Sequence, residues 1–171
     1  MDFFETVQTR RSIREYQPEP VPRDILEKIV STGIEAPSGC NMQLRQYIIA
    51  DDPAVVDQLR PASAAMKGCQ AVIVLVMDPK GTKYGEFWVQ DASAAMENML
   101  LAAVALGYGS CWIEGALRRC ENDLCDILHV PEPLRVWAMM PIGKPVKMPP
   151  RPEKSAPADV VHINTFASQE E

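Results

Sequence analysis

The first nine residues carry a hydrophobic pattern with helical spacing. Phe3, Phe4 and Val7 form one apolar stripe, and Asp2 lies three positions before Glu5, the spacing of a helix N-cap. The pattern predicts a short helix that ends where an arginine-rich stretch begins. Similar stripes, with Pro or Gly at their ends, predict further helices over residues 22–33, 53–59, 88–106 and 118–130.

The predicted helix at 88–106 differs from the others in its hydrophobic pattern. Apolar residues almost encircle it, and many of them are small. A helix of this kind is buried in a core or in an oligomer interface, and small side chains let another helix approach closely.

Strand patterns alternate with these helices. Residues 71–77 are apolar at every position, which is typical of a strand buried on both faces in a sheet covered by helices. Further strands are predicted over residues 45–50, 109–115, 134–143 and 159–164.

The last 28 residues, from Lys144, have a different composition. Five prolines between residues 144 and 157 exclude a helix or a central strand there. Fully extended, the segment would span roughly 90 Å. From its residues alone, it either docks onto a distant sheet edge, for example on a second subunit, or lies along its own subunit or is disordered.

Composition and charge indicate a single globular domain and argue against a membrane, secreted or nucleic-acid-binding protein. A length of 171 residues with 47% hydrophobic content fits one domain with a real core. No apolar run reaches the length of a membrane span, and the N-terminus does not resemble a signal peptide, so we expect a cytoplasmic protein. The net charge of −6 argues against a general nucleic-acid binder.

The five cysteines are scattered and odd in number, which indicates reduced thiols. Cys120 and Cys125 lie five apart, and no C-x-x-C pair occurs. A zinc site is one possible interpretation. We favour the other, in which Cys120 shares a buried helical face with Leu124 and Ile127 and no metal is bound.

The segment "TRRSIREY" concentrates positive charge in an acidic chain. Arg10, Arg11 and Arg14 surround Ser12, and together they offer convergent hydrogen-bond donors for a phosphate. A solvated cluster without a ligand is the alternative.

The segment "EAPSGCNMQ" follows the second predicted helix. Its sequence is compatible with a simple turn. However, Asn41 and Gln43 alternate, and their amides could read the polar edge of a heterocycle.

The segment "GYGSCWIEG" begins like a dinucleotide-binding glycine motif, but Trp112 replaces its third glycine. A helix also precedes it and a strand follows, the reverse of a Rossmann site, which is therefore excluded. Gly115 would instead let the backbone approach a ligand closely.

These three segments, followed by "PIGKP" and the proline-rich tail, resemble in order and spacing the nitroreductase family of FMN-dependent oxidoreductases. That family includes flavin reductases, iodotyrosine deiodinase-like and flavin-fragmenting enzymes. The resemblance runs from Phe3 to about Phe166. It implies an α+β fold, with a central, mostly antiparallel sheet flanked by helices, in an intertwined homodimer. Residues 144–171 would be exchanged between subunits, and residues 159–164 would add a strand to the partner's sheet.

The resemblance also implies a set of cofactor-binding residues. The FMN phosphate would be bound by Arg10, Arg11, Ser12 and Arg14, with Lys154, or Arg151 in its place, from the tail. The partner chain would supply Pro37, Ser38, Gly39, Asn41 and Gln43. Ile113, Glu114 and Gly115 would lie against the isoalloxazine.

The implied reaction needs no catalytic side chain. NADH or NADPH would pass hydride to the flavin N5, and a nitroaromatic, quinone or flavin would then be reduced in a ping-pong sequence. The alternative is an FMN-binding protein that nicotinamide does not drive: a flavin-fragmenting or dehalogenating enzyme, or a sensor or carrier.

Some residues depart from the family pattern. Leu44 and Arg45 stand where relatives often have Pro-Trp, and Cys40 lies inside the predicted flavin loop, where we interpret it as a packed small hydrophobe. For the pyrimidine edge of the flavin no residue is assigned, although Arg60, Ser63 and Lys67 are available.

Overall fold

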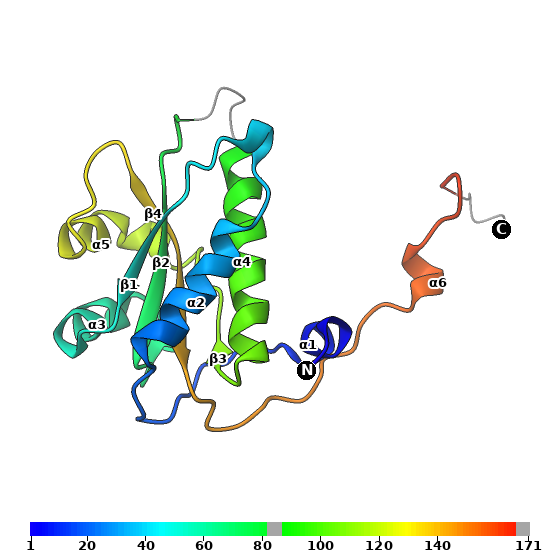
Figure 1. Ribbon diagram of the computed structural model, residues 1–171, viewed down its shortest axis with the longest axis horizontal. Helices are drawn as coiled ribbons and strands as arrows, with labels where there is room; N and C mark the ends of the chain where they lie inside the picture. Colours follow the sequence, from blue (N-terminus) through cyan, green and yellow to red (C-terminus); the bar gives the residue numbers. More distant parts are fainter. Residues whose placement is uncertain (82–86, 167–171) are drawn as a thin grey trace.

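The strand expected at residues 71–77 lies inside a four-stranded sheet (Figure 1). The computed structural model describes residues 1–81 and 87–166. All strand pairs are antiparallel, in the order β1-β2-β4-β3. The strands are β1 (Gln46–Ala50), β2 (Ala71–Met77), β3 (Gly109–Ser110) and β4 (Arg135–Gly143). The expected α+β fold is confirmed.

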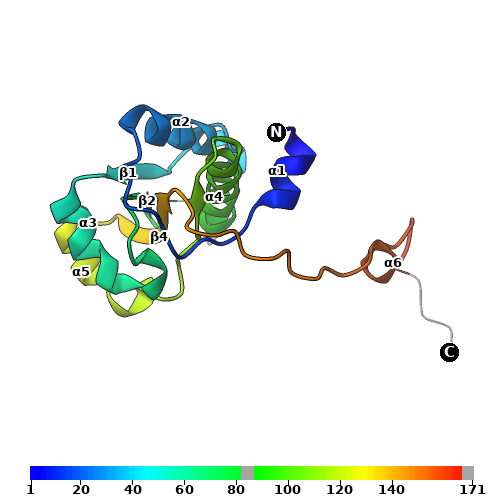
Figure 2. The ribbon, with the colours of Figure 1, turned by 90° about the horizontal axis from the view of Figure 1, so that it is seen from below.

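Two layers of helices cover the sheet (Figures 1 and 2). The helices are α1 (Phe3–Thr9), α2 (Arg23–Ile34), α3 (Pro53–Leu59), α4 (Trp88–Ala105), α5 (Glu121–Ile127) and α6 (Pro157–Val160). Helices α2 and α4 lie on one face, whereas α3 and α5 lie on the other. Of the described helices, none is long and apolar enough to cross a membrane.

Alternate side chains of β2 enter two separate cores. Ile73 and Leu75 pack with residues of α2 and α4, whereas Val72 and Val74 pack with residues of α3 and α5. Because successive side chains of a strand point to opposite faces, an unbroken apolar strand serves both layers. This explains why every residue of β2 is buried.

The first helix begins and ends where the sequence predicts. The Asp2 carboxylate accepts a hydrogen bond from the Glu5 amide at 2.8 Å, which caps α1. The helix ends at Thr9, so the arginine-rich segment that follows is extended and runs beside β3, where Ile13 N–H donates to Ser110 O at 2.8 Å.

The strand expected over residues 109–115 is much shorter in the structure. Its pairing register with β4 continues as far as Ile113, which exchanges two backbone hydrogen bonds with Met139 at 2.9 Å. In that register Cys111 lies opposite Pro141. Proline has no N–H to donate, so the ladder is interrupted there and β3 ends at Ser110.

Two further predicted elements differ from the structure, one in where it begins and one in its type. The helix expected over residues 118–130 begins only at Glu121, after a short 3-10 turn at Leu117–Arg119. The strand expected over residues 159–164 is not formed within this chain. Pro157 occupies the first position of the short helix α6, which includes Asp159 and Val160.

The tail first follows its own subunit and then departs from it. Tyr16 and Pro145 form an isolated β-bridge, and Gln17 Nε2 donates to Pro145 O at 2.7 Å. From Arg151 to Phe166 every described residue is exposed, and the chain runs away from the body of the molecule (Figures 1 and 2).

Candidate functional site

The structure gathers most of the expected phosphate-binding residues around one groove. Arg10, Arg11 and Ser12 line a groove of about 410 Å³ together with Arg151 and Lys154 from the tail. The bridge between Tyr16 and Pro145 brings the segment after α1 and the start of the tail side by side. Four cationic side chains therefore surround one space next to a serine hydroxyl, an arrangement that attracts a multivalent anion.

Two arginines of this groove differ in how they are held. Arg11 Nη1 donates to the carbonyls of Gln8 at 2.7 Å and Arg10 at 2.6 Å, while its buried Nε finds no partner among the described residues. Arg10 is half-exposed and forms an ion pair with Glu97 at 3.4 Å. Such a surface pair contributes about 0–1 kcal/mol, so it is weak competition for an anionic ligand.

Arg14 lies apart from this groove. It is exposed, it is absent from the groove lining, and its Nη1 lies 3.4 Å from Ser12 O. The expected phosphate-binding role of Arg14 therefore has less structural support than those of Arg10 and Arg11.

Residues 37–43 form a tightly turned loop between α2 and β1. Cys40, Asn41 and Gln43 all have positive φ, at 49°, 54° and 51°. Two hydrogen bonds within the loop involve side chains: Gln43 N–H donates to Ser38 Oγ at 3.0 Å, and Gln43 Nε2 donates to Asn41 Oδ1 at 3.0 Å. The interpretation of Cys40 as a packed hydrophobe is wrong, since its side chain is exposed.

The 37–43 loop and the arginine groove lie toward opposite ends of α4. Gly39 contacts Asp91 near the start of this helix, whereas Ser12 pairs with Ser110, which follows its end (Figure 1). Arg10 of the groove reaches Glu97, which lies six residues, or about 9 Å, along the helix from Asp91. The groove lining includes no residue of the 37–43 loop. Within one chain, therefore, these two groups of expected cofactor residues are not brought together.

The third expected group, residues 113–115, follows β3 and lies where the chain separates from the neighbouring strand β4. Ile113 is buried by its bridge to Met139, and Glu114 is half-buried. Gly115 is exposed, and a β-carbon added there would meet no heavy atom within 4 Å. Glu114 also lines an adjacent pocket of about 550 Å³ with Trp88 and Trp137.

The residues considered for the pyrimidine edge share a different surface. Arg60, Ser63 and Lys67 line a shallow pocket of about 510 Å³ beside α3. Arg60 is already engaged, because it pairs with Asp57 and donates to Cys69 O at 2.8 Å. The geometry favours none of the three as a ligand.

All five cysteines are free thiols. Burial raises the pKa of Cys69 and also that of Cys120. Cys120 immediately precedes α5 and packs, half-buried, against the core that contains Leu124, in agreement with a packing role. In residues 1–81 and 87–166, no three His, Cys, Asp or Glu side chains are grouped as for a metal ion.

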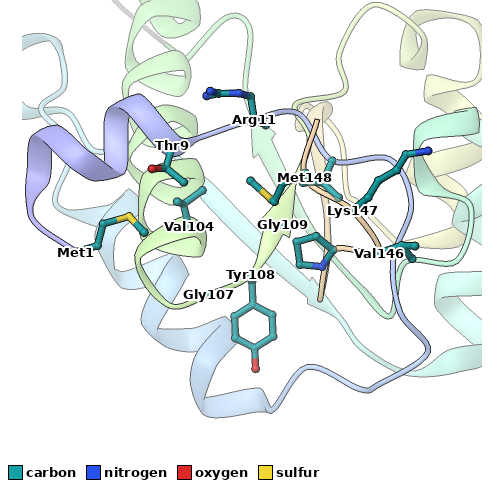
Figure 3. Close-up of a pocket in the computed structure, with 12 residues that line it drawn as sticks. Met1, Thr9, Arg11, Val104, Gly107, Tyr108, Gly109, Val146, Lys147 and Met148 are labelled. Atoms are coloured by element: carbon teal, nitrogen blue, oxygen red, sulfur yellow. The ribbon is translucent and has the colours of Figure 1, made fainter. Parts of the chain in front are cut away.

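An apolar pocket of about 400 Å³ lies between the N-terminus, the end of α4 and the first residues of the tail. Figure 3 shows Met1, Val104 and Met148 directed toward its middle, with Arg11 and Lys147 at its edges. Exposed hydrophobic side chains continue this surface onto α1, where Phe4 remains 73% exposed. A face of this kind marks a protein interface.

Sequence reasoning missed two features of the site region. Asp91 is buried and accepts a hydrogen bond from the 37–43 loop. Its signal in the sequence was an acid in the first turn of a largely apolar helix. Three tryptophans also form a cluster in which Trp137 makes edge contacts with Trp88 and Trp112. Their wide separation in the chain gave no indication of this.

Comparison with known proteins agrees with the fold and with the family that the sequence resembles. The model of the nitroreductase family matches residues 7–67 and 59–144. A protein of Methanothermobacter thermautotrophicus, provisionally named NADH dehydrogenase/NAD(P)H nitroreductase, is 30% identical over 97% of this chain and 88% of its own length. A protein of Archaeoglobus fulgidus with the same provisional name is 37% identical over 81% of this chain and 83% of its own length.

A solved structure shows the same likeness in three dimensions. It is a provisionally named nitroreductase of Desulfovibrio desulfuricans in complex with FMN. It is 27% identical to this chain, with a TM-score of 0.83 over 96% of this chain and 97% of its own. From the matched family model, the relatives and the fold, the chain belongs to the nitroreductase family.

Proposed function

We propose that this protein is an FMN-dependent oxidoreductase that takes hydride from NADH or NADPH and reduces an acceptor such as a nitroaromatic, a quinone or a flavin. The observation that carries the proposal is the groove where Arg10, Arg11 and Ser12 meet Arg151 and Lys154. Family membership and the FMN complex of a structural relative support the choice of ligand.

The groove fits the phosphate of FMN. A phosphate near neutral pH carries between one and two negative charges and needs several donors in one place. The Nε of Arg11 has no hydrogen-bond partner among the described residues, so this side chain keeps donor capacity that its own subunit does not use. Lys154 and Arg151 both lie close enough to line the same groove, so the tail would contribute to the phosphate site.

The segment 113–115 fits the ring of the flavin. The open space at Gly115 leaves room for a flat ligand against the backbone. Bound FMN supplies reversible hydride transfer between a nicotinamide donor and an acceptor. Backbone N–H groups of this segment would stabilise negative charge on the ring, and that role requires no catalytic side chain.

A second copy of this chain completes the proposed site. Because the 37–43 loop and the arginine groove lie toward opposite ends of α4, one FMN would be bound by the groove of one protomer and the loop of its partner. The exposed apolar residues of α1 and the tail, among them Phe4, Val160 and Phe166, would be covered in such a homodimer. Residues 144–171 would be exchanged between the two, since the last described part of this tail, up to Phe166, runs away from its own subunit (Figures 1 and 2).

Anaerobic spectroscopy tests the proposal. The purified protein should bind FMN and be yellow, NADH or NADPH should bleach the flavin absorbance, and a nitroaromatic or quinone should restore it. A protein that does not take up added FMN would refute the proposal. A protein that binds FMN but is not bleached by either nicotinamide would instead be a flavin-fragmenting or dehalogenating enzyme, or a sensor or carrier.

A further inference from the structure

Two oppositely charged side chains are buried beneath the 37–43 loop. Arg45 is only 7% exposed and Asp91 only 8%. They come from different elements, since Arg45 immediately precedes β1 and Asp91 lies in the first turn of α4. Buried charges are rare and costly unless hydrogen bonds satisfy them, so their contacts indicate what they are retained for.

Within residues 1–81 and 87–166, Arg45 donates only to backbone carbonyls. Its Nη2 bonds Ala36 O at 2.6 Å, and its Nη1 bonds Pro37 O at 3.1 Å and Asp91 O at 3.1 Å. The planar guanidinium thus joins the first residues of the loop to α4. A lysine could not reproduce this fork, because its ammonium group is a single point of charge.

Asp91 holds the middle of the same loop. Its carboxylate Oδ1 accepts a hydrogen bond from Gly39 N–H at 2.9 Å, across 52 positions of the chain. Gly39 directly precedes Cys40 and Asn41, which both have positive φ. Non-glycine residues rarely adopt this backbone conformation, and it persists where the surrounding structure holds it in place.

We propose that Arg45 and Asp91 are positioning residues, which together hold the 37–43 loop in the shape that contacts the partner's flavin. Arg45 fixes the loop where it leaves α2, and Asp91 fixes its turn. The exposed residues Pro37, Asn41 and Gln43 are thereby presented outward. The inference rests on the proposed FMN-dependent function and assigns a purpose to Arg45, a departure from the family pattern.

Hydrogen-bond chemistry suggests two matched variants of Asp91. Asp91→Asn keeps a side-chain oxygen that can accept from Gly39 N–H, whereas Asp91→Ala removes it. For Arg45, Arg45→Lys keeps the charge and Arg45→Met keeps only apolar bulk. Arg119→Met is the control, because it makes the same change at an exposed arginine outside the proposed site.

The experiment measures FMN dissociation constants by apo-protein titration, thermal midpoints of the apo-proteins, and hydrogen exchange at the Gly39 amide. We expect Asp91→Ala and Arg45→Lys each to raise the FMN dissociation constant about tenfold or more. The dissociation constant of Asp91→Asn should stay within about threefold of the native value. The Gly39 amide should exchange faster in Asp91→Ala and remain protected in Asp91→Asn.

The outcomes separate the inference from simpler explanations. Unchanged FMN affinity in both Asp91→Ala and Arg45→Lys overturns it. If the affinities of Asp91→Ala and Asp91→Asn fall equally, or only in proportion to the thermal midpoints, the two residues serve the fold rather than the loop, and the inference is again wrong. Should Arg45→Met fail to fold, the comparison of Asp91→Ala with Asp91→Asn still tests the inference. If the native protein itself does not bind FMN, the proposed function fails instead.

Discussion

Gly109 lies against Ile13 so closely that a β-carbon at position 109 would come within 2.6 Å of Ile13 Cγ1. The contact joins β3 to the extended segment that carries the arginines. Pro145 closes the other side, with its Cγ 2.8 Å from the same point. One glycine thus permits the N-terminal segment, β3 and the tail to meet, and the arginine groove is built on this meeting.

Gly109→Ala should therefore destabilise the apo-protein. The added methyl group would force Ile13 and Pro145 apart in a packed region, at a cost of about 1–3 kcal/mol in the free energy of unfolding. Urea denaturation of the apo-protein measures this change. An unchanged midpoint would contradict the packing described here.

Gly115→Ala is the matched substitution at a glycine in open space. No heavy atom lies within 4 Å of the added β-carbon, so the unfolding free energy of the apo-protein should change by less than about 0.5 kcal/mol. FMN binding should weaken, by about 1–3 kcal/mol, because the methyl group would occupy space assigned to the flavin ring. Equal FMN affinity in titrations of native and variant protein would remove Gly115 from the proposed site.

The arginines should distinguish FMN from riboflavin, which lacks the phosphate. Arg10→Ala and Arg11→Ala should each weaken FMN binding by about 1.5–3 kcal/mol, the value of a hydrogen bond to a charged group, and leave riboflavin binding almost unchanged. Arg14→Ala should have a smaller effect, because Arg14 lies outside the groove. Arg119→Ala serves as the exposed control, and parallel losses for both flavins would show that the groove does not bind the phosphate.

The proposed homodimer should depend on exposed apolar side chains. Phe4→Asp and Val160→Asp place a charge on residues that are 73% and 59% exposed in the single chain, so each isolated subunit should keep its fold. In a homodimer that covers both residues, a buried charge is costly, and the variants should become monomeric and lose FMN affinity. Analytical ultracentrifugation with circular dichroism measures both properties; dimers of undiminished stability would place the interface elsewhere.

Thiol alkylation should report on the 37–43 loop. Cys40 is exposed and should react with iodoacetamide first in the apo-protein at pH 8, with FMN slowing the reaction. Burial raises the pKa of Cys69, so less of its reactive thiolate is present at a given pH, and its slow alkylation should accelerate only at higher pH. Mass spectrometry of labelled peptides follows each site, and FMN-independent labelling of Cys40 would argue against its place beside the flavin.

Much of the fold follows from local patterns in the sequence. The unbroken apolar run of β2, the largely apolar α4 and the Asp2 cap of α1 each depend on neighbours in the chain, which the sequence displays directly. The boundaries that differ depend on partners far away in sequence. The ladder after Ser110 is broken by Pro141, which lies opposite Cys111 only once the β3–β4 register exists.

The candidate site likewise combines features that local sequence predicts with contacts between residues far apart in the chain. The sequence by itself determined which residue types are present, and "TRRSIREY", "APSGCNMQ" and "WIEG" predicted the chemistry through their order. Tertiary structure alone decided which of them meet: Arg151 and Lys154 join Arg10 and Arg11, Arg14 does not, and Asp91 reaches Gly39 across 52 positions. Such contacts depend on how the chain folds back on itself, and residue spacing carries little record of that.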